Sequence, residues 1–130
     1  MSIRCIKAAF AYLAIGIGLG VLFAFNRSLG PVWRPLHAEL NLWGWVTLLI
    51  YGVAYHILPR ISGRLLRWPR VAEVQSWLAI GGVSLAGAGW LGDLGDLPVA
   101  SALSAGGGTL QSLAALLFVL LIGDLLHEAG

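Results

Sequence analysis

Three polar side chains stand close together in an otherwise apolar segment: His37, Glu39 and Asn41. Ionisable and amide groups are costly inside a membrane span, and they mark a functional site there by default. A histidine in such a place can ligate a metal, or it can hydrogen-bond across helices. These residues predict a binding site on the segment that follows Pro35.

One face of the predicted helix contains His37. At 100° per residue it shares this face with a set of aromatic, amide and small residues, namely Asn41, Gly44, Leu48, Tyr51 and Tyr55. Gly44, two turns from His37, has no side chain, so a flat ring ligated by His37 could lie against the helix there. Glu39 points elsewhere and is not a partner of His37 on the same helix.

The same segment resembles a known family. His37 is followed by Gly44-Trp45 and then by Tyr51-Gly-Val-Ala-Tyr-His-Ile-Leu-Pro-Arg60. This order is similar to the second transmembrane helix of the catalytic subunit of heme-copper oxidases, especially their nitric oxide reductase and cbb3-type relatives. The resemblance covers about thirty residues of the chain. It implies that His37 is an axial ligand of a low-spin heme b. Asn41, Gly44 and Tyr51 share the helix face of His37 and are therefore expected to contact the cofactor.

The resemblance implies only part of the family's machinery. The family's catalytic subunit has twelve or more helices, and its copper-site histidines, high-spin heme ligand and second low-spin ligand lie on later helices. This chain has about four predicted helices, so we expect no complete active site for oxygen or nitric oxide reduction.

A low-spin heme needs a second axial ligand, usually His, Met, Cys or Tyr. His56 lies about 28 Å from His37 along the helix, at 1.5 Å per residue. His127, Cys5 and Met1 are also predicted at the opposite side of the membrane. Either the heme is five-coordinate, or two copies of His37 bind one heme across the two-fold axis of a homodimer, the arrangement we favour.

Two arginines, Arg27 and Arg34, flank the histidine segment. Heme propionates are carboxylates, which arginine pairs with in a fork geometry. Contact with lipid headgroups is the alternative role for both. A second, weaker candidate metal site lies at the other side, where Cys5, His56, Asp124, His127 and Glu128 gather at helix ends, but no ligand spacing supports it.

The elements that must position these residues follow from composition. The chain has 130 residues, 58% hydrophobic and 11% charged, with a mean hydropathy of +0.85. Each membrane span takes roughly 20 apolar residues, so we expect a single all-α domain over residues 1–130, a four-helix transmembrane bundle. Its expected spans are Ile6–Phe25, Leu36–Leu58, Val71–Leu91 and Val99–Leu121, with a loop over Asn26–Pro35 that places Pro35 in the first turn of the second helix.

Arginine placement predicts the orientation. Four arginines lie in the twelve residues from Pro59 to Arg70, while the loop Gly92–Pro98 is acidic. The positive-inside rule predicts that both termini are cytoplasmic and that His37 lies near the outer face of the membrane. We expect a multi-pass protein of the inner (cytoplasmic) membrane. Glycines such as Gly16 and Gly20, in a GxxxG motif, are typical of close helix packing.

The leading interpretation is a small membrane heme b protein for electron transfer, gas sensing or heme handling. Its expected partners are the lipid bilayer, a second copy of the chain and a redox partner. The alternatives are a cofactor-free accessory or assembly subunit of a larger membrane complex, and a metal-ion carrier that uses the cytoplasmic His and Cys groups. The net charge of +2 does not favour nucleic-acid binding. The sequence has neither a nucleophile–base–acid set nor a phosphate-binding loop, so it does not suggest a hydrolase.

Overall fold

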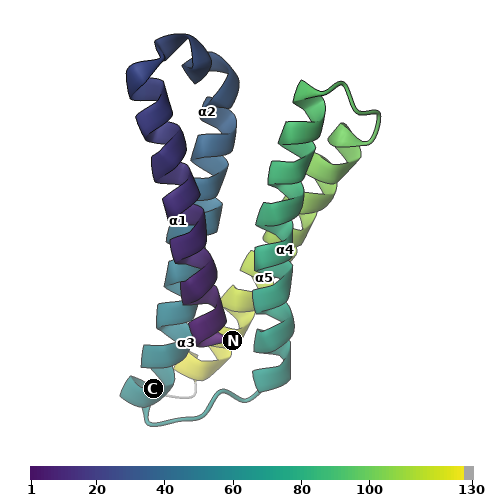
Figure 1. The fold of residues 1–130 in the computed structure, drawn as a ribbon. Coiled ribbons are helices and arrows are strands. Elements are labelled where there is room, and N and C mark those ends of the chain that lie inside the picture. The colour runs from purple at the N-terminus through teal and green to yellow at the C-terminus, as the bar shows by residue number, and fades with distance from the viewer. Residues whose placement is uncertain (128–130) are drawn as a thin grey trace.

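The computed structural model describes residues 1–127, and within that range the chain is helical without strands (Figure 1). The first helix, α1, spans Ser2–Phe25 and is followed by a 3-10 turn, η1, at Arg27–Leu29. The second helix runs without a break through three segments: α2 (Gly30–Glu39), the π-helical η2 (Leu40–Thr47) and α3 (Leu48–Ser62). The third and fourth long helices are α4 (Pro69–Leu94) and α5 (Ala100–His127). The predicted all-α bundle of four helices is confirmed for this part of the chain.

Three of these helices are long and apolar enough to cross a membrane: Ser2–Phe25, Arg27–Ser62 and Ala100–His127. The remaining helix, α4, has the length but a more polar composition, since it contains Glu73, Gln75, Ser76, Ser84 and Asp93 and several glycines in place of larger apolar residues. Of these polar side chains Gln75 and Ser76 are fully buried in the bundle, which is where polar groups of membrane proteins are normally placed. Length and composition therefore support three of the four expected spans.

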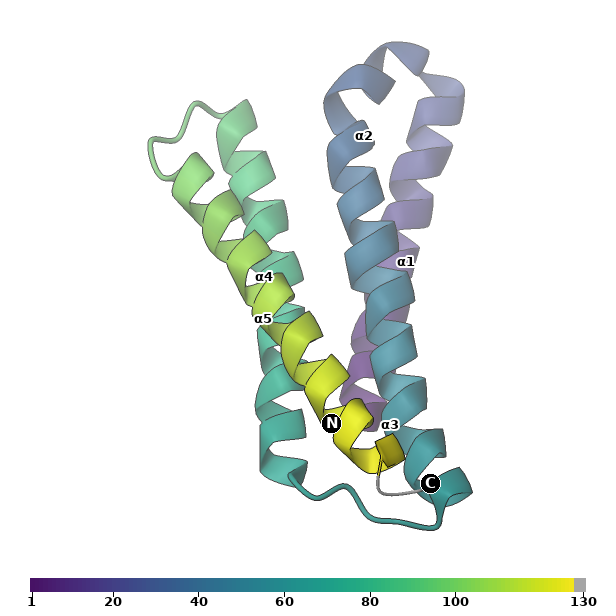
Figure 2. The ribbon, with the colours of Figure 1, turned by 180° about the vertical axis from the view of Figure 1, so that it is seen from behind.

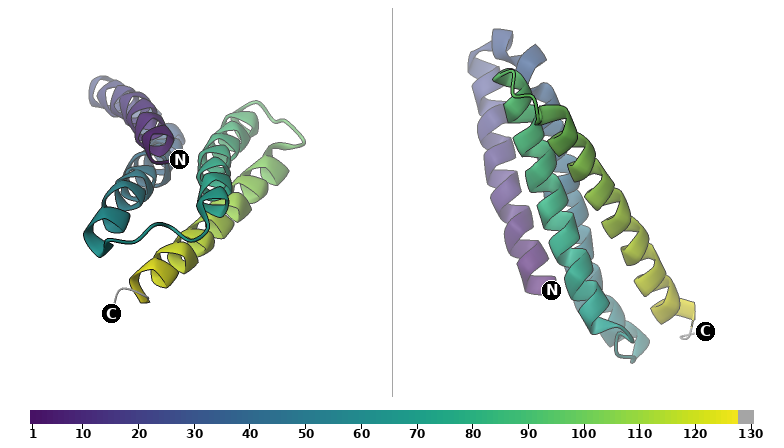
Figure 3. Two further views of the ribbon diagram at one scale, coloured as in Figure 1. Left: turned by 90° about the horizontal axis from the view of Figure 1, so that it is seen from below. Right: turned by 90° about the vertical axis from the view of Figure 1, so that its right-hand side faces the viewer.

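The four helices form two antiparallel hairpins, one of α1 with α2–α3 and one of α4 with α5 (Figures 1 and 2). The hairpins approach each other at the end that holds Met1 and the connection from α3 to α4, and they diverge toward the other end. Seen from below, they form two adjacent pairs (Figure 3). His37 lies in the half of the molecule where the hairpins diverge.

The second helix begins and ends outside its predicted limits. It starts at Gly30, with Pro31 in its first turn, so the expected loop over Asn26–Pro35 and the start at Leu36 are wrong. The Asn26 side chain accepts a hydrogen bond from the Ser28 backbone at 3.2 Å, which closes the short turn η1. Because Pro31 already has the fixed φ that a first turn needs, the helix begins one turn earlier than at Pro35.

The expected end at Leu58 is also wrong, because α3 continues through Pro59 to Ser62. Pro59 has the φ of a helix but lacks the N–H that would bond to the Tyr55 carbonyl oxygen, so it weakens the last turn without ending the helix. The end is set instead by Gly63, whose φ of 66° is the left-handed conformation that commonly terminates helices.

Glycines bring α4 and α5 into direct backbone contact. A Cβ atom added at Gly107 would lie 2.7 Å from the Cα atom of Ala86 and 2.7 Å from the carbonyl oxygen of Gly82. One added at Gly89 would lie 2.5 Å from the backbone nitrogen of Ser104. Small residues are therefore required where α4 and α5 touch.

A buried polar link joins the two hairpins where they approach. The Tyr55 hydroxyl of α3 donates to Gln75 Oε1 of α4 at 3.0 Å, and Gln75 Nε2 donates to the carbonyl oxygen of Ala114 in α5 at 3.1 Å. The Phe118 ring lies 4.4 Å from the Tyr51 ring and 5.5 Å from the Tyr55 ring, measured between centroids. This link fixes the position of α3 against the second hairpin.

Replacing Tyr55 with phenylalanine should destabilise the protein by about 1–2 kcal/mol, because buried Gln75 Oε1 loses its hydrogen-bond donor. The free energy of unfolding can be measured by SDS titration of the detergent-solubilised protein, with helicity as the signal. Ser112→Ala removes an exposed hydroxyl that bonds only within its own helix and should change stability by less than about 0.5 kcal/mol. Equal effects from the two substitutions would contradict a structural role for the Tyr55–Gln75 link.

Candidate functional site

The His37 side chain is held against α1. Its Nδ1 atom lies 2.9 Å from the carbonyl oxygen of Gly16. Its Cε1 atom faces Gly20, where an added Cβ would come within 3.3 Å. The Phe23 ring stands edge-on to the imidazole, with 5.5 Å between centroids. Three residues of one face of α1 thus set the position of the histidine ring.

Asn41 extends this arrangement by one helical turn. Its Nδ2 atom donates to the His37 carbonyl oxygen at 2.7 Å, and its amide group fills the space in front of Gly16, 2.6 Å from where a Cβ would be. Gly16 and Gly20 therefore receive Asn41 and His37, residue against residue. The sequence indicated close packing by the GxxxG motif but not that it receives the histidine. The signal was the matching four-residue spacing of the two pairs.

The contact with Gly16 determines which ring nitrogen can bind a ligand. A carbonyl oxygen only accepts hydrogen bonds, so Nδ1 carries the proton in this contact, and the neutral ring has its lone pair on Nε2. A histidine that ligates a metal through one nitrogen commonly donates its other N–H to a backbone carbonyl. In this tautomer Nε2 is the nitrogen that could ligate a metal, and the Asn41 Nδ2 atom lies 3.5 Å from it, so a ligand at Nε2 would have to displace that amide.

The predicted face of the second helix is divided by the π-helical segment Leu40–Thr47. Such segments turn less per residue than an α-helix and often occur at functional sites. His37, Asn41 and Gly44 face α1, whereas Tyr51 packs on Phe118 of α5. The structure brings His37 and Asn41 together but does not bring Tyr51 to them.

The space at Gly44 is filled by Tyr12 of α1. A Cβ added at Gly44 would lie 2.7 Å from the Tyr12 Cβ and 2.8 Å from its Cγ. The Tyr12 hydroxyl reaches across to α4, 2.7 Å from Ser84 Oγ and 3.2 Å from the Ile80 carbonyl oxygen. His37 could therefore supply an axial ligand to a heme iron, but the helix surface at Gly44 is already covered. A porphyrin lying flat on Gly44 would require Tyr12 to move.

Arg27 and Arg34 are both exposed, at the end of the molecule that contains His37. Arg27 belongs to the turn η1. Arg34 lies on α2 three residues before His37, so the Arg34 and His37 side chains leave neighbouring parts of the helix surface. Neither guanidinium makes an ion pair within residues 1–127. Both are free to bind a carboxylate at this end.

Glu39 lies away from His37, as the helix geometry predicted. Its carboxylate accepts a hydrogen bond from Gln111 of α5. The Gln111 side chain is buried, so this bond joins α5 to the second helix.

The residues at the opposite end do not form a metal centre in the described part of the chain, where no three His, Cys, Asp or Glu side chains are close enough to hold an ion. Cys5 is buried, and His56 is exposed and accepts a hydrogen bond from Arg60. Asp124 lies 3.8 Å from Arg67. Glu128 is outside the described residues.

Trp77 is exposed, and its ring centroid lies 4.3 Å from the Cζ atom of Arg4. Arg4 also pairs with Glu73 at 3.1 Å.

Comparison of the chain with protein-family models, with curated proteins and with solved structures finds no match.

Proposed function

We propose that this chain is a small integral membrane protein that binds heme b through His37 and acts in electron transfer, gas sensing or heme handling. The observation that carries the proposal is the contact of His37 Nδ1 with the Gly16 carbonyl oxygen at 2.9 Å, which assigns the ligand role to Nε2 once the Asn41 amide, 3.5 Å away, has moved aside. The resemblance of this segment to the low-spin heme helix of heme-copper oxidases supports it. When bound, the heme supplies a one-electron couple or a site for a diatomic gas.

The residues of the site have separate roles in this proposal. Gly16 and Phe23 orient the imidazole, and Asn41 fixes the backbone turn that carries it. Arg27 and Arg34 pair with the propionates. Their place on the outer side also explains why two arginines violate the positive-inside rule, given cytoplasmic termini and a cytoplasmic loop from Pro59 to Arg70 in an inner membrane.

A low-spin heme iron bound to His37 needs a second axial ligand. His56 and His127 belong to the other end of the molecule, and the described residues near His37 offer no further His, Cys or Met. A homodimer in which two copies of His37 bind one heme would supply two identical ligands by symmetry. The alternative is a five-coordinate heme that leaves one face open to a gas.

Titration of hemin into the detergent-purified protein tests the proposal. A Soret band that saturates at one heme per two chains supports a shared bis-histidine heme, and one heme per chain with carbon monoxide binding supports the five-coordinate form. Absence of saturable hemin binding would contradict both.

Gly16→Val should weaken heme binding by about 10- to 100-fold, the usual effect of losing a group that orients a metal ligand. The added side chain would displace the Asn41 amide and separate the Gly16 carbonyl from His37. Gly18→Val is the matched control on the same helix, since no atom lies within 4 Å of its added Cβ. Hemin titration of both variants measures the difference, and equal affinities would argue against a role for the Gly16 contact.

A cofactor-free accessory or assembly subunit is the second candidate. The observation that favours it is that His37 is already hydrogen-bonded and packed between Gly16, Gly20 and Phe23, as a residue that simply joins two helices would be. In that case the protein purifies colourless, co-purifies with a larger complex, and His37→Gln retains its stability.

A further inference from the structure

The carboxylate of Glu39 has a neutral partner only. It accepts a hydrogen bond from the Gln111 amide, and no Lys, Arg or His pairs with it within residues 1–127. Glu39 belongs to the helix Arg27–Ser62, which is long and apolar enough to span a membrane. A carboxylate without a counter-ion is costly in such a span, and it marks a functional site.

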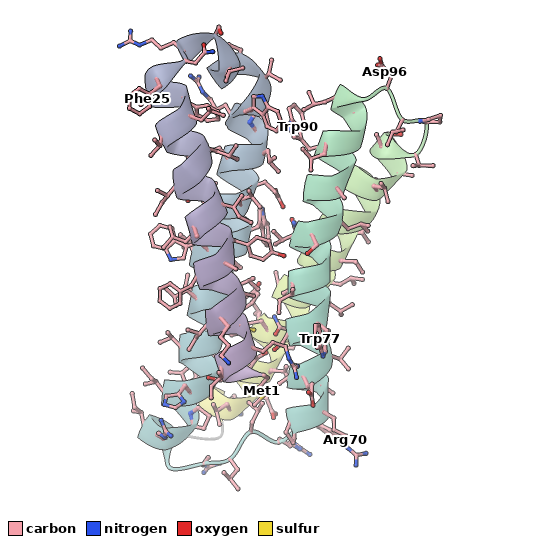
Figure 4. The ribbon with its side chains drawn as sticks, viewed as in Figure 1. Met1, Phe25, Arg70, Trp77, Trp90 and Asp96 are labelled. Carbon is pink, nitrogen blue, oxygen red and sulfur yellow. The ribbon has the colours of Figure 1, made fainter. Side chains whose placement is uncertain are left out.

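Glu39 also lines a pocket between α2, α4 and α5. The pocket has a volume of about 240 Å³, and its walls are largely apolar, formed by Pro35, Leu36, Ala86 and the Trp90 ring. Polar groups converge at Glu39, Gln111 and Ser104. Figure 4 shows Trp90 in the opening between α2 and α4, in the half where the hairpins diverge. A mostly apolar hollow with a few convergent polar groups is the usual form of a small-molecule site.

The chemistry of the walls selects the charge of the ligand. A carboxylate repels anions and attracts cations. Tryptophan is the side chain with the strongest attraction for a cation over its ring. A strongly hydrated metal ion would gain little from walls such as Pro35, Leu36 and Ala86, whereas a cation that carries apolar groups would bury them there.

The size of the pocket is consistent with such a ligand. A cavity of about 150 Å³ accommodates benzene, so a volume of about 240 Å³ has room for one ring or a branched alkyl group beside the charged centre. We propose that the pocket between Glu39, Trp90 and Gln111 binds a small organic cation of the alkylammonium class.

This site is separate from the one proposed around His37. The imidazole faces Gly16 and Gly20 of α1, while Glu39 faces Gln111 of α5. Cation binding should therefore persist in His37→Ala, and heme binding should persist in Glu39→Gln. Failure of one proposal is distinguishable from failure of the other.

Isothermal titration of the full-length protein in a non-ionic detergent with benzyltrimethylammonium tests the site. We expect saturable binding to the wild type and a loss of affinity of about 10- to 100-fold in Glu39→Gln, which keeps the shape and removes the charge. Glu73→Gln is the matched control, since that carboxylate is exposed near the other end of α4. Its affinity should stay within about twofold of the wild type.

Trp90→Leu provides a second variant should Glu39→Gln fail to fold, and it should weaken binding by about 3- to 30-fold. The uncharged isostere neopentylbenzene should bind much more weakly than the cation. The proposal is overturned if the wild type shows no saturable binding, if Glu39→Gln binds as the wild type does, or if the neutral isostere binds equally well.

Discussion

Gly107→Ala is expected to destabilise the protein by about 2–3 kcal/mol, the cost of forcing an extra methyl group into a packed interface. The methyl carbon would lie 2.7 Å from both the Ala86 Cα and the Gly82 carbonyl oxygen. These are backbone atoms, so no side-chain rotation relieves the overlap, and α4 and α5 must separate. SDS titration with helicity as the signal measures the change in the free energy of unfolding.

Gly108→Ala is a control in the adjacent position. No atom lies within 4 Å of the Cβ that it adds, and alanine has the higher helix propensity, by about 1 kcal/mol. Stability should therefore be unchanged or slightly increased. If Gly107→Ala were as stable as Gly108→Ala, α4 and α5 could not pack through Gly107 as the structure shows.

His37→Ala should abolish heme binding under the proposed function. Losing a group that only orients a ligand costs about 10- to 100-fold in metal affinity, so losing the ligand itself should cost more. Hemin titration of the purified variant should give no saturable Soret band. Its helicity should remain that of the wild type, because His37 is only partly buried and loss of its ring leaves the remaining contacts of α1 with the second helix in place.

His56→Ala is the matched control for this substitution. His56 is on the same helix and exposed, with Arg60 as its hydrogen-bond partner, and it lies about 28 Å from His37 at 1.5 Å per residue. It should bind hemin as the wild type does. Equal loss in both variants would mean that neither histidine is a specific ligand and that the effect is general unfolding.

Much of the fold could be predicted from the sequence because hydropathy reports helices directly. Four apolar stretches separated by proline, glycine and charged residues correspond to the four helices of the structure. The boundaries were less predictable, since Pro31 and Pro35 are both chemically suited to a first turn and only the closed turn at Asn26 decides between them. The other end was equally hard to predict, because the helix continues through Pro59 and is terminated by the left-handed Gly63.

The site was predictable residue by residue but not in its orientation. His37 and Asn41 were identified as costly polar groups, and the structure brings them together. A constant 100° per residue also placed Tyr51 with them, but the π-helical segment changes the rotation after His37. Tyr12 and Gly44 are far apart in the sequence and lie on different helices, so only the folded chain reveals that Tyr12 covers Gly44.

The absorption spectrum of the detergent-purified protein, oxidised and then reduced, tests the central claim most directly. Heme b on His37 predicts a Soret band that shifts on reduction, with sharp visible bands if two histidines ligate the iron. A protein that is colourless in both states, and that stays so after incubation with hemin, would contradict the assignment of His37 as a heme ligand.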